Sequence, residues 1–182
     1  NVAPNVQKLF DETKKAWLAA NPQPDEASKS GYVNKQAFEL HKAAIAAEES
    51  QDWVECIDKD RSALTLEENM RARMHLAGCE EKAGKLVDAL RDYAKALEAA
   101  RAKGDAVTTK VIQERVTTII PRLAHVKFER PVEVTELQVT FDDRNVPEAR
   151  LGESFTIDPG THKVHAEGLL RGARVSSDET FE

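Results

Sequence analysis

The 182-residue sequence has few aromatic residues, few cysteines and no long apolar run, and each shortage excludes a class of protein. Aromatic residues make up 5% of the chain, which is little for stacking bases or sugar rings. No apolar stretch approaches the roughly 20 residues that span a bilayer, so we expect no membrane insertion within this segment. The net charge is -6, from 26 Lys and Arg against 32 Asp and Glu, and this excess of acid argues against a nucleic-acid partner.

The two cysteines, Cys56 and Cys79, are too few to form a tetrahedral metal site unaided. We recognise no CxxC motif and no clustered Cys/His pair beside them, so we expect no metal. We expect both to be small, buried packing residues, and a disulfide between them is the alternative.

Motifs that bind cofactors or perform catalysis are also missing. The chain has no glycine-rich phosphate loop and no G-x-S-x-G context around a serine, so we expect neither a cofactor nor enzymatic activity. Paired carboxylates such as Glu48-Glu49 and Glu67-Glu68 are typical of solvated caps and turns. Acid–base chemistry would need an apolar pocket that separates their pKa values, and nothing in the sequence predicts one.

Apolar residues recur at helical spacing from Asn5 to about Ile120 and alternate at strand spacing from Leu123 onward. Because proline ends a helix at the residue before it, we place a domain boundary at Pro121, between domains of residues 1–121 and 122–182. We expect about six helices, the first between Pro4 and Asn21 and the others at residues 32–49, 53–64, 67–83, 86–103 and 106–120. The first would place on one face Val6, Leu9, Phe10, Thr13 and Trp17.

The helical part aligns with itself at a shift of 33 residues, which brings Trp53 onto Leu86. The same shift brings Cys56 onto Ala89, Ala63 onto Ala96 and Ala44 onto Ala77. A period of this length is typical of stacked helical hairpins, none of which buries its own apolar face alone. A plain antiparallel helix bundle with a chance period is the alternative.

The second copy resembles the tetratricopeptide repeat (TPR). The residues that carry the resemblance are Gly84, Leu86, Ala89, Tyr93 and Ala96. In the earlier copy Gln51 stands where the turn glycine belongs. The resemblance implies a concave face that binds another protein or a peptide, and we place in this groove His41, Arg73, His75, Glu80 and Tyr93. Because Arg73 and Glu80 replace the family's usual aromatic residues, the lining would differ from the family's.

Residues 122–182 contain short alternating segments separated by turns, which predicts a small, mostly antiparallel β-sandwich. The stretch from Leu137 to Gly168 resembles a PEGA-type or carboxypeptidase-regulatory-like β-domain, through the Pro-Gly-x-His-x-Val hairpin at Pro159 to Val164. Asp143 stands where that family has a turn glycine. We expect Phe128, Phe141 and Phe155 to be core residues. The predicted fold is therefore α+β, in two segregated domains.

These features predict a non-catalytic protein–protein interaction or scaffold module. The pair of domains resembles bacterial cell-envelope proteins, which implies a periplasmic or extracellular location, with the cytoplasm as the alternative. The first residue is Asn1 rather than Met, as expected of a processed or partial chain. The alternative function is a ligand-sensing or cell-wall (glycan) binding domain of a larger receptor or membrane-anchored protein.

Overall fold

The structure of the chain is a computed structural model that describes residues 4–20 and 25–182. The predicted end of the first helix at Asn21 lies outside the described residues, as do the side chains of Val6, Leu9, Phe10 and Trp17. The first helix, α1, spans Pro4–Ala20. None of the helices in the described ranges has the length and apolar character needed to cross a membrane.

Six further helices precede the strands among the described residues. They are α2 (Glu26–Lys29), α3 (Lys35–Glu49), α4 (Trp53–Leu66), α5 (Met70–Lys82), α6 (Leu86–Ala102) and α7 (Ala106–Ile119). Side-chain caps define where several of them begin, because the carboxylate or amide oxygen accepts a hydrogen bond from the first turn. The capping residues are Asn34 for α3, Asp52 for α4, Asn69 for α5 and Asp105 for α7.

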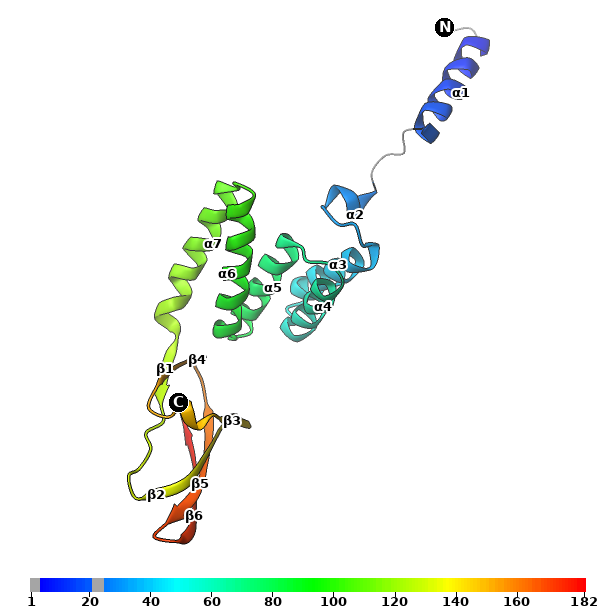
Figure 1. The fold of residues 1–182 in the computed structure, drawn as a ribbon. Coiled ribbons are helices and arrows are strands. Elements are labelled where there is room, and N and C mark those ends of the chain that lie inside the picture. The colour runs from blue at the N-terminus through cyan, green and yellow to red at the C-terminus, as the bar shows by residue number, and fades with distance from the viewer. Residues whose placement is uncertain (1–3, 21–24) are drawn as a thin grey trace.

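Consecutive helices pack against one another from α3 to α7, and Figure 1 shows them side by side. Alanines such as Ala44, Ala77 and Ala96 are fully buried, so the helices can approach closely where they cross. The turns that follow α3 and α5 contain Gln51 at φ 59° and Gly84 at φ 76°. These residues are 33 positions apart, so the predicted period coincides with a repeated left-handed turn conformation.

The helical part ends with α7 at Ile119, and a short 3-10 helix, η1 (Ile120–Arg122), contains Pro121. A two-stranded antiparallel sheet pairs β1 (Ala124–Lys127) with β4 (Ser154–Ile157). A second antiparallel sheet has the strand order β3-β2-β5-β6. Its strands are β2 (Val134–Phe141), β3 (Arg144–Val146), β5 (His162–Leu170) and β6 (Ala173–Phe181), with a 3-10 turn, η2 (Glu148–Arg150), between β3 and β4. The α+β organisation predicted from the periodicity is confirmed.

A β-bulge interrupts the pairing of β2 with β5 between Thr135 and Gln138. Glu136, inside the bulge, has φ 53°. Gly168 of β5 faces this irregularity, and a Cβ atom there would lie 2.6 Å from Val134 Cγ1 and 3.0 Å from the carbonyl oxygen of Thr135. Glycine is therefore required where β5 passes the bulge.

Candidate functional site

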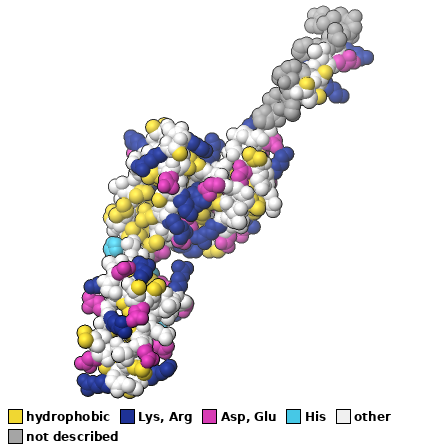
Figure 2. Space-filling view, in the orientation of Figure 1, with side chains coloured by type: hydrophobic (Ala, Val, Ile, Leu, Met, Phe, Trp, Pro, Cys, Tyr) yellow, Lys and Arg dark blue, Asp and Glu magenta, His cyan; other side chains and the backbone are white. Residues whose placement is uncertain are grey.

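An open groove of about 370 Å³ lies along the inner helices of the stack. Its lining comes mainly from α5, with residues of α3, α6 and α7, and consists of Glu48, Arg71, Met74, His75, Gly78, Tyr93, Val111 and Arg115. Figure 2 shows hydrophobic side chains gathered over the α6–α7 end of the helical part. Val107 and Val111 of α7 are 77% and 43% exposed, so this end offers an apolar contact surface.

Two arginines border the groove without a carboxylate partner. Arg71 and Arg115 are both exposed, and neither forms an ion pair with any residue in the described ranges. By contrast, Arg61, Arg73 and Arg91 of the same helical part are all paired. The groove thus combines apolar Met74 and Val111 with two guanidinium groups that are available to an anionic ligand.

The five residues that the sequence assigned to a common groove do not share one surface. His75 and Tyr93 line the groove, although Tyr93 is only 4% exposed. His41 and Glu80 are buried inside the stack, and Arg73 lines a different depression, next to Leu64 and Leu76. We expected these polar side chains to face solvent in the groove. The side chains of His41, Arg73 and Glu80 instead connect neighbouring helices.

A His–Asp cluster, defined as His41, Asp60 and His75, lies where α3, α4 and α5 meet. His41 Nδ1 is 2.7 Å from one carboxylate oxygen of Asp60, and His75 Nδ1 is 2.6 Å from the other. Asp60 is completely buried. His75 Nε2 lies 3.0 Å from the carboxylate of Glu48. Burial lowers the pKa of His75, but the hydrogen bonds and negative charges of Asp60 and Glu48 outweigh it, so that this pKa is raised above its usual value.

Two further buried carboxylates are held by arginines from neighbouring helices. Arg61 of α4 donates a 2.7 Å hydrogen bond to Glu80 of α5, and Arg73 of α5 donates a 2.5 Å hydrogen bond to Asp92 of α6. Glu80 is fully buried and its second oxygen has no hydrogen-bond partner among the described residues. Burial raises the pKa of Glu80 to about 7, and Arg61 offsets only part of this effect. These contacts tie adjacent helices together inside the stack.

Cys56 of α4 and Cys79 of α5 are joined by a disulfide, with their Cα atoms 6.2 Å apart. Both are almost completely buried, so they are packing residues as expected, but bonded rather than separate. The Cys56 sulfur lies 3.9 Å from His75 Nδ1, beside the His–Asp cluster. Within residues 4–20 and 25–182, two sets of side chains have a geometry that could hold a metal ion: the His–Asp cluster, and His75 with the two cysteines if these were reduced.

A larger cleft, of about 550 Å³, lies between the helical part and the sheets. The backbone N–H of Val87, at the start of α6, donates a 2.7 Å hydrogen bond to Asp158 of the β4–β5 turn. Since α6 has no side-chain cap of its own, this turn supplies one. The lining of the cleft includes Phe128, Phe141 and Phe155, which are half-buried rather than fully enclosed as core residues.

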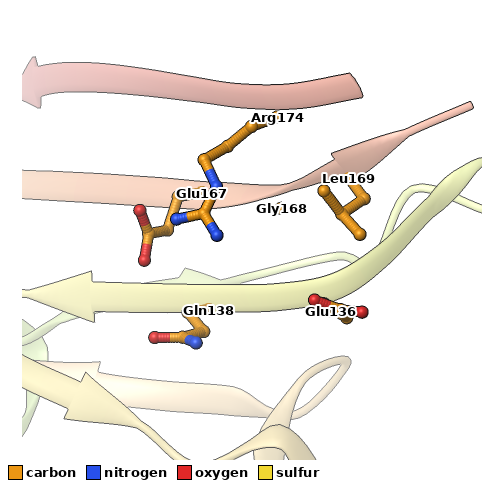
Figure 3. Close-up of a pocket in the computed structure, with 6 residues that line it drawn as sticks. All are labelled: Glu136, Gln138, Glu167, Gly168, Leu169 and Arg174. Carbon is orange, nitrogen blue, oxygen red and sulfur yellow. The ribbon is translucent and has the colours of Figure 1, made fainter. Parts of the chain in front are cut away.

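The four-stranded sheet carries a small pocket between Glu136, Gln138, Glu167 and Arg174 (Figure 3). Its volume of about 30 Å³ matches a single water molecule. This pocket is therefore too small for a peptide or a sugar.

The chain matches no protein-family model, no curated protein and no solved structure. The site must therefore be judged by its own geometry. The sequence does not predict the His–Asp cluster or the buried ion pair of Asp92, because the residues that contact each other come from different helices. One signal was available: His75 and Cys79 are four residues apart, so they lie on the same face of α5. A repeated separation of 19 residues was another, because it joins His41 to Asp60, Arg61 to Glu80 and Arg73 to Asp92.

Proposed function

We propose that this chain is a non-catalytic protein-interaction module, in which a short stack of TPR-like helical hairpins binds a partner protein. The consecutive helix packing and the repeated turn at Gln51 and Gly84 support the TPR-like assignment. The antiparallel strands and the turn from Asp158 to Gly160 support a PEGA-like assignment for the second part. Through the resemblance of this domain pair, we place the module in a bacterial cell envelope, as a scaffold component.

The observation that carries the proposal is the pair of unpaired arginines in the groove. Arg71 and Arg115 come from different helices and line the same groove as the apolar side chains of Met74 and Val111. An extended segment with acidic residues on either side of an apolar residue complements this arrangement. Solvent-exposed ion pairs contribute about 0.2–1 kcal/mol each, so the two arginines would add specificity for such a segment, and reversing both charges would add repulsion.

A displayed library of random peptides, selected against the intact chain, tests the proposal. We expect the selected peptides to be rich in Asp or Glu next to apolar residues. Their affinity should fall at least tenfold in the Arg71→Glu/Arg115→Glu variant. Arg101→Glu is the matched control, because Arg101 is an exposed α6 arginine outside the groove. Peptides that bind the double variant and the parent chain equally well would refute the proposal.

Arg73 and Glu80, which the sequence suggested as partner-binding residues, are unsuitable for this experiment. Each makes an internal ion pair, with Asp92 and Arg61 respectively. Charge reversal would place a carboxylate beside the buried Asp92 in Arg73→Glu, and an ammonium group at the fully buried position 80, beside Arg61, in Glu80→Lys, so a loss of binding would report unfolding.

The cleft beside the sheets favours a second candidate, the binding of a cell-wall glycan. Phe128, Phe141 and Phe155 line it together with Arg144 and Arg150, a combination of aromatic faces and donors that suits a sugar chain. Sedimentation with purified peptidoglycan tests this candidate. The whole chain should co-sediment, and Phe155→Ala should reduce the bound fraction. If the chain stays in the supernatant, glycan binding is excluded.

A further inference from the structure

We propose that the His–Asp cluster is a binding site for a divalent transition-metal ion such as Zn²⁺, with His41, Asp60 and His75 as its ligands. The site goes beyond the proposed function, because it would hold an ion between helices rather than a partner protein, although His75 also lines the groove. Each residue comes from a different helix: His41 from α3, Asp60 from α4 and His75 from α5. A bound ion would therefore connect three consecutive helices.

The ligand atoms are already gathered. One atom from each of the three residues lies within 4.8 Å of the others. The imidazole rings of His41 and His75 are 5.2 Å apart and nearly perpendicular, at 89°, so both can direct a nitrogen toward a common point. Around a tetrahedral Zn²⁺ with bonds of about 2.0–2.1 Å, ligand atoms are about 3.3 Å apart. Small side-chain rotations bring the three atoms to this spacing.

The charge balance of the cluster favours a cation. Asp60 is completely buried, and among the described residues its hydrogen-bonding and ion-pair partners are the two histidines. A carboxylate removed from water needs a compensating positive charge. At present hydrogen bonds with the two imidazole rings satisfy its two oxygens. A divalent ion in the same place would supply the positive charge and displace any proton from a ligating Nδ1 atom.

The surroundings of the two histidines resemble those of histidines that bind metal ions in other proteins. A ligating histidine commonly donates its other ring N–H to a carboxylate, which fixes the orientation of the ring. His75 has this arrangement, because its Nε2 lies 3.0 Å from Glu48 while its Nδ1 points to Asp60. His41 packs against the ring of Tyr32 at 5.8 Å between centroids.

The types of ligand atom at the site narrow the choice of metal ion. His75 also lines the open groove, so one ligand of the site borders solvent. With Cys56 and Cys79 bonded to each other, the donors are two imidazole nitrogens and one carboxylate oxygen. This set suits Zn²⁺, Cu²⁺ or Ni²⁺ rather than Ca²⁺ or Mg²⁺, which prefer oxygen ligands.

The test is calorimetric titration of the intact chain with Zn²⁺, after treatment with a chelator and after a thiol assay has shown that both cysteines are oxidised. We expect one ion per chain and a higher melting temperature. His75→Gln and Asp60→Asn should each lower the affinity more than tenfold. Glu48→Ala removes only the outer carboxylate on a half-exposed side chain, so it should keep the fold and lower the affinity about 10–100-fold.

His165→Gln is the matched control, because His165 of β5 forms a similar but solvent-exposed pair with Asp178 of β6, at 2.8 Å. Its affinity for Zn²⁺ should equal that of the parent chain. The proposal is overturned if the oxidised chain binds no Zn²⁺, or if Glu48→Ala binds as tightly as the parent. It is equally overturned if binding appears only after reduction, since the thiolates of Cys56 and Cys79 would then be the ligands.

Discussion

Replacing Glu80 with glutamine should make the protein more stable at mildly alkaline pH. Glu80 is buried, its second oxygen lacks a partner, and its pKa is raised from 4.5 to about 7. In the unfolded chain this carboxyl ionises near pH 4.5, whereas in the folded chain it keeps its proton until about pH 7. Its favourable contribution is therefore complete below the unfolded pKa and is lost as the pH rises through the folded pKa.

The size of the effect follows from the shift. Each pKa unit corresponds to about 1.4 kcal/mol, so the rise to about 7 is equivalent to roughly 3 kcal/mol, most of which is lost between about pH 5 and pH 8. Glutamine cannot ionise, and its carbonyl oxygen can still accept the hydrogen bond from Arg61. Between those two pH values, Glu80→Gln should gain about 2–3 kcal/mol of unfolding free energy relative to the parent chain.

Urea unfolding of both proteins at about pH 5 and pH 8 measures this difference directly. All other titratable groups are common to both chains, so their contribution cancels. Glu98→Gln is the control, since Glu98 lies exposed on α6 and should leave the difference unchanged. A Glu80→Gln variant whose stability relative to the parent is the same at both pH values would refute the assignment of a raised pKa to Glu80.

Four further changes test individual contacts of the fold. Reduction of the Cys56–Cys79 disulfide, which closes a loop of 23 residues, should lower the unfolding free energy by about 3 kcal/mol, measured in urea with and without reductant. Gly168→Ala should destabilise by about 1–3 kcal/mol because its Cβ has no room, whereas helical Gly78→Ala should stabilise by about 0.5–1 kcal/mol in the same assay. Asp158→Ala should cost about 1 kcal/mol through the lost cap, and unchanged amide exchange at the start of α6 would contradict that.

The longer helices could be predicted from the sequence because their capping residues and their apolar periodicity are local features. Asp52 and Asp105 cap the starts of α4 and α7, and the observed bounds lie within a few residues of those predicted. The sequence does not predict α2, since four residues make a single turn and carry no apolar period. The PEGA-type resemblance begins at Leu137, whereas β2 begins at Val134, because the bulge at Glu136 interrupts the alternation of apolar residues.

The candidate site was harder to predict, because its residues are defined by contacts between helices. His41 and Glu80 are polar, and polarity alone suggests exposure, whereas both are buried with partners 19 residues away. Arg71 and Arg115 were overlooked for the opposite reason. An arginine on a helix usually finds a carboxylate nearby, and only the folded arrangement reveals that these two do not.

The covalent link between Cys56 and Cys79 has a consequence for how the stack comes apart. Arrays of hairpins usually fray unit by unit from their ends, since each unit contacts only its neighbours. Here the bond joins the second helix of one hairpin to the first helix of the next. Complete separation of α4 from α5 is thus prevented near these two residues while the sulfurs stay oxidised.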